Sequence, residues 1–318
     1  MLSKFGYRQN KTLHLFVHIP KTAGTSFRAS LEKSQNVACD YGEKSEHTSP
    51  VVSNCIYQNN DAYSLKTALA EKDSWLCGHV HLSKYLGLIP PEDIVTFVRE
   101  PTARVVSHFN HELRWGKSAI EQSDFFSSAR AMNYQHRFLQ GLPLSLIGFV
   151  GLTEQYAKSL TLLDAEMSVT VEEAMFNQND QKVSEIEDLD EALLSSIKDQ
   201  NALDNDLYES AKQLLAQRIV MAEKGLPWTY IHAEVSSRNL VGIAYRRAGN
   251  EPVELSLTVN GEEKGTLVAC EFTSLFPQAK FPRDRFVGFS YRLTRNFDKE
   301  DVVELLVRDT EQEYLVKL

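Results

Sequence analysis

Short apolar runs alternate with amphipathic segments along the first 226 residues of the chain. The apolar runs lie at residues 13–19, 74–80, 94–98 and 146–152. Runs of this length are typical of strands that are buried on both faces of a parallel sheet. Between them, apolar residues recur at helical spacing at 27–33, 64–72, 102–115, 124–140, 153–160, 184–199 and 204–223. With a short strand expected at 51–57 and a brief helix at 82–86, this order predicts an α/β domain built on a parallel sheet.

The pattern changes near residue 230. From there, alternating β-branched segments follow at 240–245, 253–259, 266–270, 286–293 and 302–307, with no long helical pattern between them. Asn260-Gly261 separates two of these segments and is the strongest short hairpin signal. We therefore predict two domains, an α/β domain over residues 1–227 and a small all-β, sandwich-like domain over residues 228–318.

Composition and charge narrow the class of protein. The 318 residues are 42% hydrophobic and carry a net charge of −9, and residues 151–225 hold 16 acidic and 6 basic side chains. This acidity argues against general nucleic-acid binding. No run approaches the roughly 18 apolar residues of a membrane span, and the N-terminus has no hydrophobic signal region. The four cysteines form no C-x-x-C pair or metal-ligand cluster. We expect a cytoplasmic protein without a membrane span or a metal site.

Candidate chemistry begins where the first apolar run ends. The chain turns there and enters a helix through Lys21, Thr22, Ala23, Gly24, Thr25 and Ser26. A buried strand, a tight turn and a helix N-terminus bring unpaired N–H groups and the positive end of the helix dipole to one point. Together with the Lys21 charge and the hydroxyl groups, they predict a phosphate or sulfate site. It is not a Walker A loop, because Lys21 precedes Gly24 instead of following it. An ordinary strand–turn–helix with surface Lys and Thr is the alternative.

A second polar cluster follows the apolar run at 94–98. An Arg-Glu-Pro sequence (residues 99–101) stands at its end, and the next predicted helix carries Arg104 and Ser107. Because ligands of open α/β sheets bind beyond the carboxyl ends of the strands, these residues and Arg99 belong on the same edge as Lys21. Proline at the first helical position favours a helix start here. A surface or helix-capping role of Arg99 is the alternative.

Five segments, in this order, resemble carbohydrate sulfotransferases: HIPKTAGTSF, GHVH, TFVREPTARVVSHF, FVGLTEQYAKSL and LDNDLYESAKQLL. The likeness covers residues 12–222 and is closest to the uronosyl (heparan and dermatan) 2-O-sulfotransferases and their bacterial relatives. It implies a P-loop-like, three-layer α/β fold. It also implies an enzyme that moves a sulfuryl group from 3′-phosphoadenosine-5′-phosphosulfate (PAPS) to a hydroxyl of a glycan or glycan precursor. The product is 3′-phosphoadenosine 5′-phosphate (PAP), and no metal is required.

The resemblance assigns roles to the two polar clusters. Residues 20–26 form the 5′-phosphosulfate loop with Lys21 as the catalytic lysine, and the cofactor contacts fall on Thr22, Ala23, Gly24, Thr25 and Ser26. Arg99 and Ser107 match the residues that hold the 3′-phosphate, and Arg104 contributes to that motif or braces it. These residue types suit the chemistry, because sulfuryl transfer needs positioning and charge stabilisation, and an Arg fork binds phosphate bidentately.

The general base is expected within Cys77-Gly78-His79-Val80-His81. By resemblance, His79 matches the second His of a His-Gly-His segment and is the candidate base, while Cys77 replaces the first His. An imidazole is a suitable base near neutral pH. His81 and Glu112 are alternatives, and so is a His79 that only caps the strand end.

Contacts to the acceptor are assigned only by resemblance. They fall on His81, Asn133, Gln135 and Arg137, for which ordinary surface polar positions are the alternative. The C-terminal segments resemble a small β-module that is appended to bacterial glycosyltransferases and polysaccharide enzymes. We therefore expect a carbohydrate acceptor as partner and no nucleic acid, and we leave homo-oligomer formation open.

Two other functional classes compete with the sulfotransferase. A P-loop-type kinase is disfavoured because the Walker A lysine position is missing. A non-catalytic glycan-binding protein is disfavoured because the chain retains Lys21, Arg99, Ser107 and His79.

Overall fold

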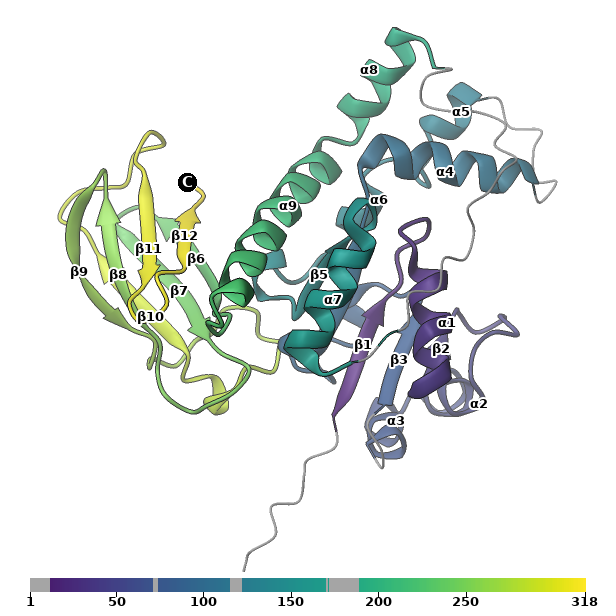
Figure 1. Cartoon of the computed structure of the whole chain (residues 1–318), viewed down its shortest axis with the longest axis horizontal. Coiled ribbons are helices and arrows are strands. Elements are labelled where there is room, and N and C mark those ends of the chain that lie inside the picture. Colours follow the sequence, from purple (N-terminus) through teal and green to yellow (C-terminus); the bar gives the residue numbers. More distant parts are fainter. Residues whose placement is uncertain (1–11, 71–73, 115–121, 170, 172–188) are drawn as a thin grey trace, which may run out of the picture.

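The computed structural model of the chain describes residues 12–70, 74–114, 122–169, 171 and 189–318. Two regions of different architecture follow one another in it. An α/β region ends with a long helix at residue 223, and an antiparallel all-β region begins at residue 230. Figure 1 shows the two regions side by side, with the all-β strands at the left.

A five-stranded parallel sheet forms the centre of the α/β region. Its strands are β1 (Leu13–Val17), β2 (Asn36–Asp40), β3 (Ser74–Gly78), β4 (Ile94–Val98) and β5 (Phe149–Leu152). They are ordered β2-β3-β1-β4-β5, and each neighbouring pair is parallel. The predicted α/β class with a parallel sheet is therefore confirmed. Because β3 and β2 lie on one side of β1 and β4 and β5 lie on the other, the strand order switches at β1, where ligands of such sheets bind.

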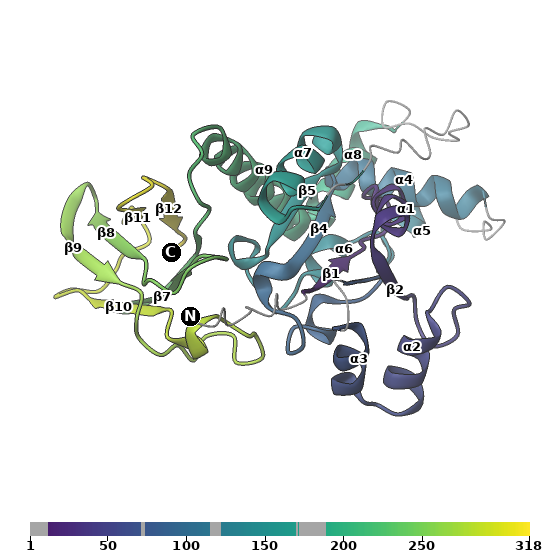
Figure 2. The same cartoon turned by 60° about the horizontal axis from the view of Figure 1, so that its bottom comes forward.

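Helices flank this sheet or pack on one another beyond its end, as Figures 1 and 2 show. They are α1 (Gly24–Ser34), α2 (Pro50–Val52), α3 (Ala62–Leu69), α4 (Pro101–Arg114), α5 (Gln122–Phe126), α6 (Tyr134–Phe138), α7 (Tyr156–Met167), α8 (Glu191–Gln200) and α9 (Ala202–Glu223). Helices α7 and α9 pack against the edge strand β5, and α1 packs beside β2. As predicted, α4 starts with a proline directly after the Arg99-Glu100 pair.

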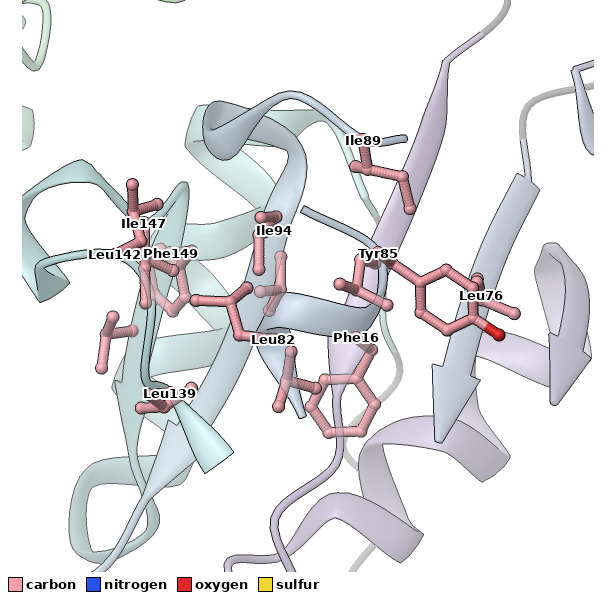
Figure 3. Close-up of a cluster of buried hydrophobic side chains, with 14 of the residues drawn as sticks. Phe16, Leu76, Leu82, Tyr85, Ile89, Ile94, Leu139, Leu142, Ile147 and Phe149 are labelled. Atoms are coloured by element: carbon pink, nitrogen blue, oxygen red, sulfur yellow. The ribbon is translucent and has the colours of Figure 1, made fainter. Parts of the chain in front are cut away.

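The main core includes the segment that joins β3 to β4. Every residue of β1, β3, β4 and β5 is buried, as their continuous apolar runs require. Leu82, Tyr85 and Ile89 of the joining segment belong to the same buried cluster as Leu76 and Ile94 of the strands. Figure 3 shows these side chains lying against the sheet. The close packing fixes the strands and hence the positions of the polar residues at their carboxyl ends.

The all-β region consists of two antiparallel sheets, β10-β7-β6 and β12-β11-β8-β9. The strands are β6 (Tyr230–Ser236), β7 (Asn239–Tyr245), β8 (Glu254–Val259), β9 (Glu262–Val268), β10 (Gly288–Arg292), β11 (Val303–Val307) and β12 (Glu313–Val316). A separate buried cluster draws on both sheets and includes Leu240, Leu257 and Leu305. Asn260 and Gly261 join β8 to β9 with φ angles of 53° and 76°, as a two-residue hairpin turn requires. The predicted hairpin is confirmed.

Part of the contact between the all-β region and the α/β region lies at the amino-terminal ends of the parallel strands. Arg247, after β7, donates from Nη1 to Asp93 Oδ1 at 2.7 Å and from Nη2 to the Glu92 carbonyl, just before β4. Tyr230 donates to the Gly148 carbonyl, just before β5, at 3.3 Å. Burial, together with the nearby Asp93 charge, raises the pKa of the Glu92 carboxyl to about 7. These contacts lie at the opposite end of the sheet from the carboxyl ends of its strands.

Arg218 of α9 contacts Trp228, which lies in the segment between α9 and β6, and also binds two groups of the α/β region. Its Nη1 pairs with Glu166 Oε2 at 2.6 Å, and its Nη2 donates to the Ile147 carbonyl at 3.3 Å. The same guanidinium lies 4.4 Å from the centre of the Trp228 ring. Arg218 is 3% exposed, so the carboxylate and the aromatic face compensate a buried charge.

Several predictions of local structure were wrong. The segment predicted as a strand at 51–57 is helical, with α2 followed by a π-helix at Ser53–Gln58. Its apolar residues Val52 and Cys55 enter the core at helical spacing. The long helix predicted at 124–140 is broken into α5 and α6. Residues 127–133 separate the two helices, and Asn133, directly before α6, takes a left-handed conformation with a φ of 45°.

Candidate anion-binding and catalytic site

The predicted anion loop joins β1 to α1. It turns sharply because Lys21 and Ala23 both adopt left-handed conformations, with φ angles of 73° and 65°. Thr22 between them is fully buried, and its hydroxyl donates to the Ile19 carbonyl at 2.9 Å, which closes the turn. Left-handed conformations are uncommon outside glycine, and strain of this kind concentrates at functional sites.

In the part of the chain that the structure describes, no side chain caps the N-terminus of α1, whereas a side chain caps that of α4. Helix α1 has no side-chain cap and no acidic residue in its first turn. In α4, the Glu100 carboxylate accepts the N–H groups of Thr102 and Ala103 at 3.1 and 2.6 Å. Uncapped first-turn N–H groups and the helix dipole favour an anion. Of these two helices, α1 is therefore the one suited to an external anion, and its first turn contains the exposed Thr25 and the buried Ser26.

Gly24 allows the end of β1 to pack directly on this loop. A Cβ atom at Gly24 would lie 2.1 Å from Cδ2 of His18. The His18 ring is 5% exposed, and its centre lies 5.4 Å from that of the Phe16 ring in a stacked arrangement. The turn therefore needs a residue without a Cβ atom at position 24, because the His18 imidazole fills that space.

Arg99 reaches the loop from the end of β4. Its Nη1 donates to the Lys21 carbonyl at 3.3 Å. Gln135 holds the Arg99 backbone on both sides, because its Oε1 accepts the Arg99 N–H at 2.9 Å and its Nε2 donates to the Arg99 carbonyl at 2.8 Å. Gln135 is fully buried. The structure therefore brings Lys21 and Arg99 together at the β1–β4 switch and uses Gln135 to fix Arg99.

Positive charge accumulates around Lys21. The pKa of Lys21 is lowered, first by burial and then by the charges of Arg99 and Arg114. Burial also lowers the pKa of Arg99, against the opposing charges of Glu154 and Glu100. Both carboxylates are occupied, since Glu100 caps α4 and Glu154 accepts the Glu100 N–H at 2.9 Å. An anion bound here would favour the charged forms of both cations.

One face of α4 is directed toward the same place. Ser107, His111 and Arg114 lie one turn apart along this helix, and Ser107 is half-buried. Burial is the main cause of the lowered pKa of both His79 and Lys21, and the charges of His111 and Arg114 add to it in the same direction. The predicted Ser107 thus stands on the α4 face whose charges act on the site.

Arg104 has a structural position. It is fully buried, donates from Nη2 to the Ala131 carbonyl at 2.6 Å, and lies 5.0 Å from the centre of the Tyr134 ring. These contacts tie α4 to the segment between α5 and α6. Of the two roles that the sequence left open, bracing is the one that these contacts support.

His79 follows β3 and lies beside the end of β1. Its Nδ1 is 2.6 Å from the His18 carbonyl oxygen. A carbonyl can only accept, so Nδ1 carries a hydrogen, and in the neutral ring Nε2 keeps a free lone pair. Desolvation by the surrounding protein, and then the charges of Arg28 and His111, lower the pKa of His79 despite the bond to His18. The ring keeps part of its surface exposed, so a neutral imidazole with an available Nε2 stands at the site, as a general base requires.

Cys77, which replaces the first His of the family segment, is not exposed beside His79. It is fully buried in β3, and burial raises the pKa of its thiol. The imidazole next to His79 is that of His18, with ring centres 4.3 Å apart. Sequence comparison of the Cys77-Gly78-His79 segment alone does not identify this neighbour, because it comes from β1.

The other predicted acceptor contacts have partners inside the protein. Nδ1 of His81 donates to the Arg137 carbonyl at 2.8 Å, and Nε of Arg137 donates to the Asn133 carbonyl at 3.4 Å. Oδ1 of Asn133 accepts the Leu203 N–H at 3.0 Å and so caps α9. The alternative base Glu112 pairs with Arg130 at 3.0 Å. None of these contacts involves Lys21, Arg99 or His79, so the described structure does not join these residues to the loop.

Two residues of the site were missed by sequence reasoning. His18 stands at the carboxyl end of β1, where the rule that located Lys21 also applies. Tyr41 stands at the end of β2, a strand that was not predicted. Its hydroxyl lies 3.0 Å from Nδ1 of His18, and its ring centre lies 4.8 Å from that of His79, edge to face.

Comparison of the sequence with models of known protein families and with curated proteins finds no match. Among the described residues, none of the helices is both long and apolar enough to cross a membrane. The same residues contain no group of three or more His, Cys, Asp or Glu side chains arranged to hold a metal ion. The geometry at the carboxyl ends of β1, β3 and β4 therefore carries the functional assignment.

Proposed function

We propose that the protein is a sulfotransferase that moves a sulfuryl group from PAPS to a hydroxyl of a carbohydrate. The observation that carries the proposal is the meeting of Lys21, the uncapped α1 N-terminus and Arg99 at the switch between β1 and β4. Two cations and a helix dipole at one point suit a ligand with more than one anionic group. The anion loop after the central strand supports a P-loop-like sulfotransferase fold. The place of Lys21 before Gly24 argues against a loop of the ATP-binding Walker A type.

Residues near the N-terminus of α1 bind one end of the PAPS molecule, and Arg99 and α4 bind the other. The loop at residues 20–26 holds the 5′-phosphosulfate, with Lys21 and the first N–H groups of α1 against its oxygens. Arg99 and Ser107 hold the 3′-phosphate, for which the planar Arg fork is suited. The lowered pKa values of Lys21 and Arg99 support this assignment, because burial disfavours both positive charges and a bound anion would compensate them.

His79 receives the acceptor proton. PAPS supplies the sulfuryl group: the acceptor oxygen bonds to sulfur, the bond from sulfur to the 5′-phosphate oxygen breaks, and PAP leaves. The hydroxyl proton passes to Nε2 of His79, since Nδ1 already donates to the His18 carbonyl. Lys21 and the α1 N–H groups stabilise the charge that develops on the leaving phosphate.

The donor assignment is tested by calorimetry with PAP. The wild-type chain should bind PAP and should bind ATP much more weakly. Loss of a charge-assisted hydrogen bond, about 1.5–3 kcal/mol, should weaken PAP binding by roughly 10- to 150-fold in Lys21→Ala. Lys44→Ala, at an exposed loop position, is the matched control and should bind like the wild type. A wild-type protein with no affinity for PAP would remove the basis of the proposal.

The base assignment is tested with the transfer reaction. Sulfated products are measured by mass spectrometry against a panel of surface-polysaccharide precursors with PAPS supplied. His79→Ala should fold and bind PAP, but its turnover should fall by roughly 10²- to 10⁴-fold, as for loss of a general base. His81→Ala, which changes the other exposed histidine of the segment, should retain turnover. Near-normal turnover in His79→Ala would show that His79 is not the base.

A further inference from the structure

The backbone of His18 makes two hydrogen bonds with the Gly78-His79 segment. The His18 N–H donates to the Gly78 carbonyl at 2.9 Å and so continues the β1–β3 pairing beyond Val17. The His18 carbonyl then accepts Nδ1–H of His79 at 2.6 Å. His79 is thus anchored to a residue that lies two positions before the anion loop, and its tautomer depends on where that residue lies.

The His18 side chain is in turn fixed by three neighbours. Its ring packs on Gly24 of the loop and is stacked with Phe16. Its Nδ1 hydrogen bonds with the Tyr41 hydroxyl at 3.0 Å. Tyr41 also places its ring edge to face with His79, and Arg28 lies 5.3 Å from the centre of the Tyr41 ring. Tyr41 therefore contacts both imidazoles at the same time.

We propose that His18 and Tyr41 are positioning residues that hold His79 as the Nδ1–H tautomer and leave its Nε2 free to accept a proton. This role rests on the proposed function, because it concerns the orientation of the base. Neither side chain has to touch the acceptor. His18 acts through its carbonyl, which its ring and the Tyr41 hydroxyl keep in place. Tyr41 acts through its bond to His18 and its contact with the His79 ring.

The charged and titratable groups around His79 favour its neutral form. Arg28 comes from α1, His111 from α4, His18 from the end of β1 and Tyr41 from the end of β2. Burial keeps His18 and Tyr41 neutral, because it lowers the pKa of the first and raises that of the second. Desolvation, and then the positive charges of Arg28 and His111, lower the pKa of His79 against the opposing effect of its bond to the His18 carbonyl. These groups thus keep the base unprotonated near neutral pH.

The first test measures the tautomer directly. Long-range ¹H–¹⁵N spectra of the full chain with ¹⁵N-labelled histidine distinguish Nδ1–H from Nε2–H, and His79→Gln identifies the His79 signals. The wild type should show a single Nδ1–H form at pH 7.5. An Nε2–H form, or a mixture, in the wild type would overturn the proposal. The spectra require no turnover, so this result is independent of whether the chain transfers sulfuryl groups.

The second test uses variants with a built-in rescue. Tyr41→Phe keeps the ring and removes only the hydroxyl, and His18→Ala removes the whole imidazole. In both, a second His79 tautomer should appear and kcat should fall by roughly tenfold or more, as when the hydrogen-bond partners around a functional imidazole are removed. His18→Asn, whose amide replaces the Nδ1 position, should restore much of the wild-type behaviour. Tyr63→Phe, at a tyrosine that is 77% exposed, is the control.

The pH profile separates positioning from a general loss of structure. Removal of the His18 ring admits water beside His79 and relieves its desolvation, so the acid limb of kcat/KM should move to higher pH in His18→Ala. KM for PAPS should change little in Tyr41→Phe, because Tyr41 does not contact the anion loop. If both variants retain a single Nδ1–H form and an unshifted acid limb, His18 and Tyr41 are not positioning residues. If the tautomer changes as expected but no sulfuryl transfer is found with any acceptor, the proposed function fails instead.

Discussion

Substitution of Gly24 by Ala tests how closely the anion loop depends on His18. The new Cβ would lie 2.1 Å from Cδ2, 2.4 Å from Nε2 and 2.8 Å from Cγ of His18, whereas carbon atoms in contact are about 3.5–4.0 Å apart. The ring or the helix start therefore has to move by roughly 1 Å or more. The ring has little room, because it lies between Phe16 and His79. Overpacking of this kind costs about 1–3 kcal/mol.

Two measurements follow from this magnitude. Thermal unfolding should show a melting temperature lower by roughly 2–4 °C for each kcal/mol of lost stability. If the loop moves to relieve the overlap, PAP binding in calorimetry should weaken by about 5- to 150-fold. Gly87→Ala is the matched control, since its Cβ would lie 3.6 Å from the Gln278 carbonyl, an ordinary contact. A Gly24→Ala protein that melts and binds PAP like this control would refute the reasoning.

The contacts between the two regions give two further predictions. The folded pKa of Glu92, about 7, lies above its unfolded value of about 4.3. The folded state therefore binds the extra proton, and stability falls as pH rises from about 4.5 through about 7. Glu92→Gln should remove this fall and melt above the wild type at pH 8 but close to it at pH 5; parallel pH–melting curves would contradict this. Arg218→Ala leaves Glu166 unpaired and removes the contact with Trp228, so urea unfolding should show a loss of roughly 3–5 kcal/mol. The exposed Arg308→Ala should lose under about 1 kcal/mol, and equal losses in the two variants would contradict the role of Arg218.

The central strands could be predicted because strands that are buried on both faces appear in the sequence as continuous apolar runs. β1, β3 and β4 are continuous apolar runs, and the structure buries every residue in each of them. β2, which reads NVACD, lies at the edge of the sheet, and its residues include an exposed Asn36. A short edge strand of which only the last three residues are buried carries a weaker signal. Tyr41 was missed for that reason.

Only those residues of the candidate site that directly follow a predicted strand could be predicted from the sequence. Lys21 and Arg99 follow β1 and β4, and the rule for open sheets brings them to one edge. The bond from His79 to the His18 carbonyl depends on the β1–β3 register, in which Val17 pairs with Gly78. Gln135 reaches Arg99 across 36 positions of sequence. Such long-range pairings depend on tertiary packing, so the local pattern predicted that Lys21 and Arg99 share one edge of the sheet but not how their side chains are held.

The docking of the all-β region at the amino-terminal ends of the parallel strands has a consequence for the length of the acceptor. Arg247 contacts the residues just before β4, and Arg99 directly follows that strand. The five residues of β4 extend about 16 Å at 3.3 Å per residue. The all-β region also contacts α9, where Gln217 donates to the Glu313 carbonyl and Lys317 to Ser210. A carbohydrate that touches both the anion loop and the surface around Arg247 must span this length of the sheet. Any help that this surface gives to catalysis should therefore appear only with acceptors of several sugar residues, and transfer to a monosaccharide should be insensitive to substitutions on it.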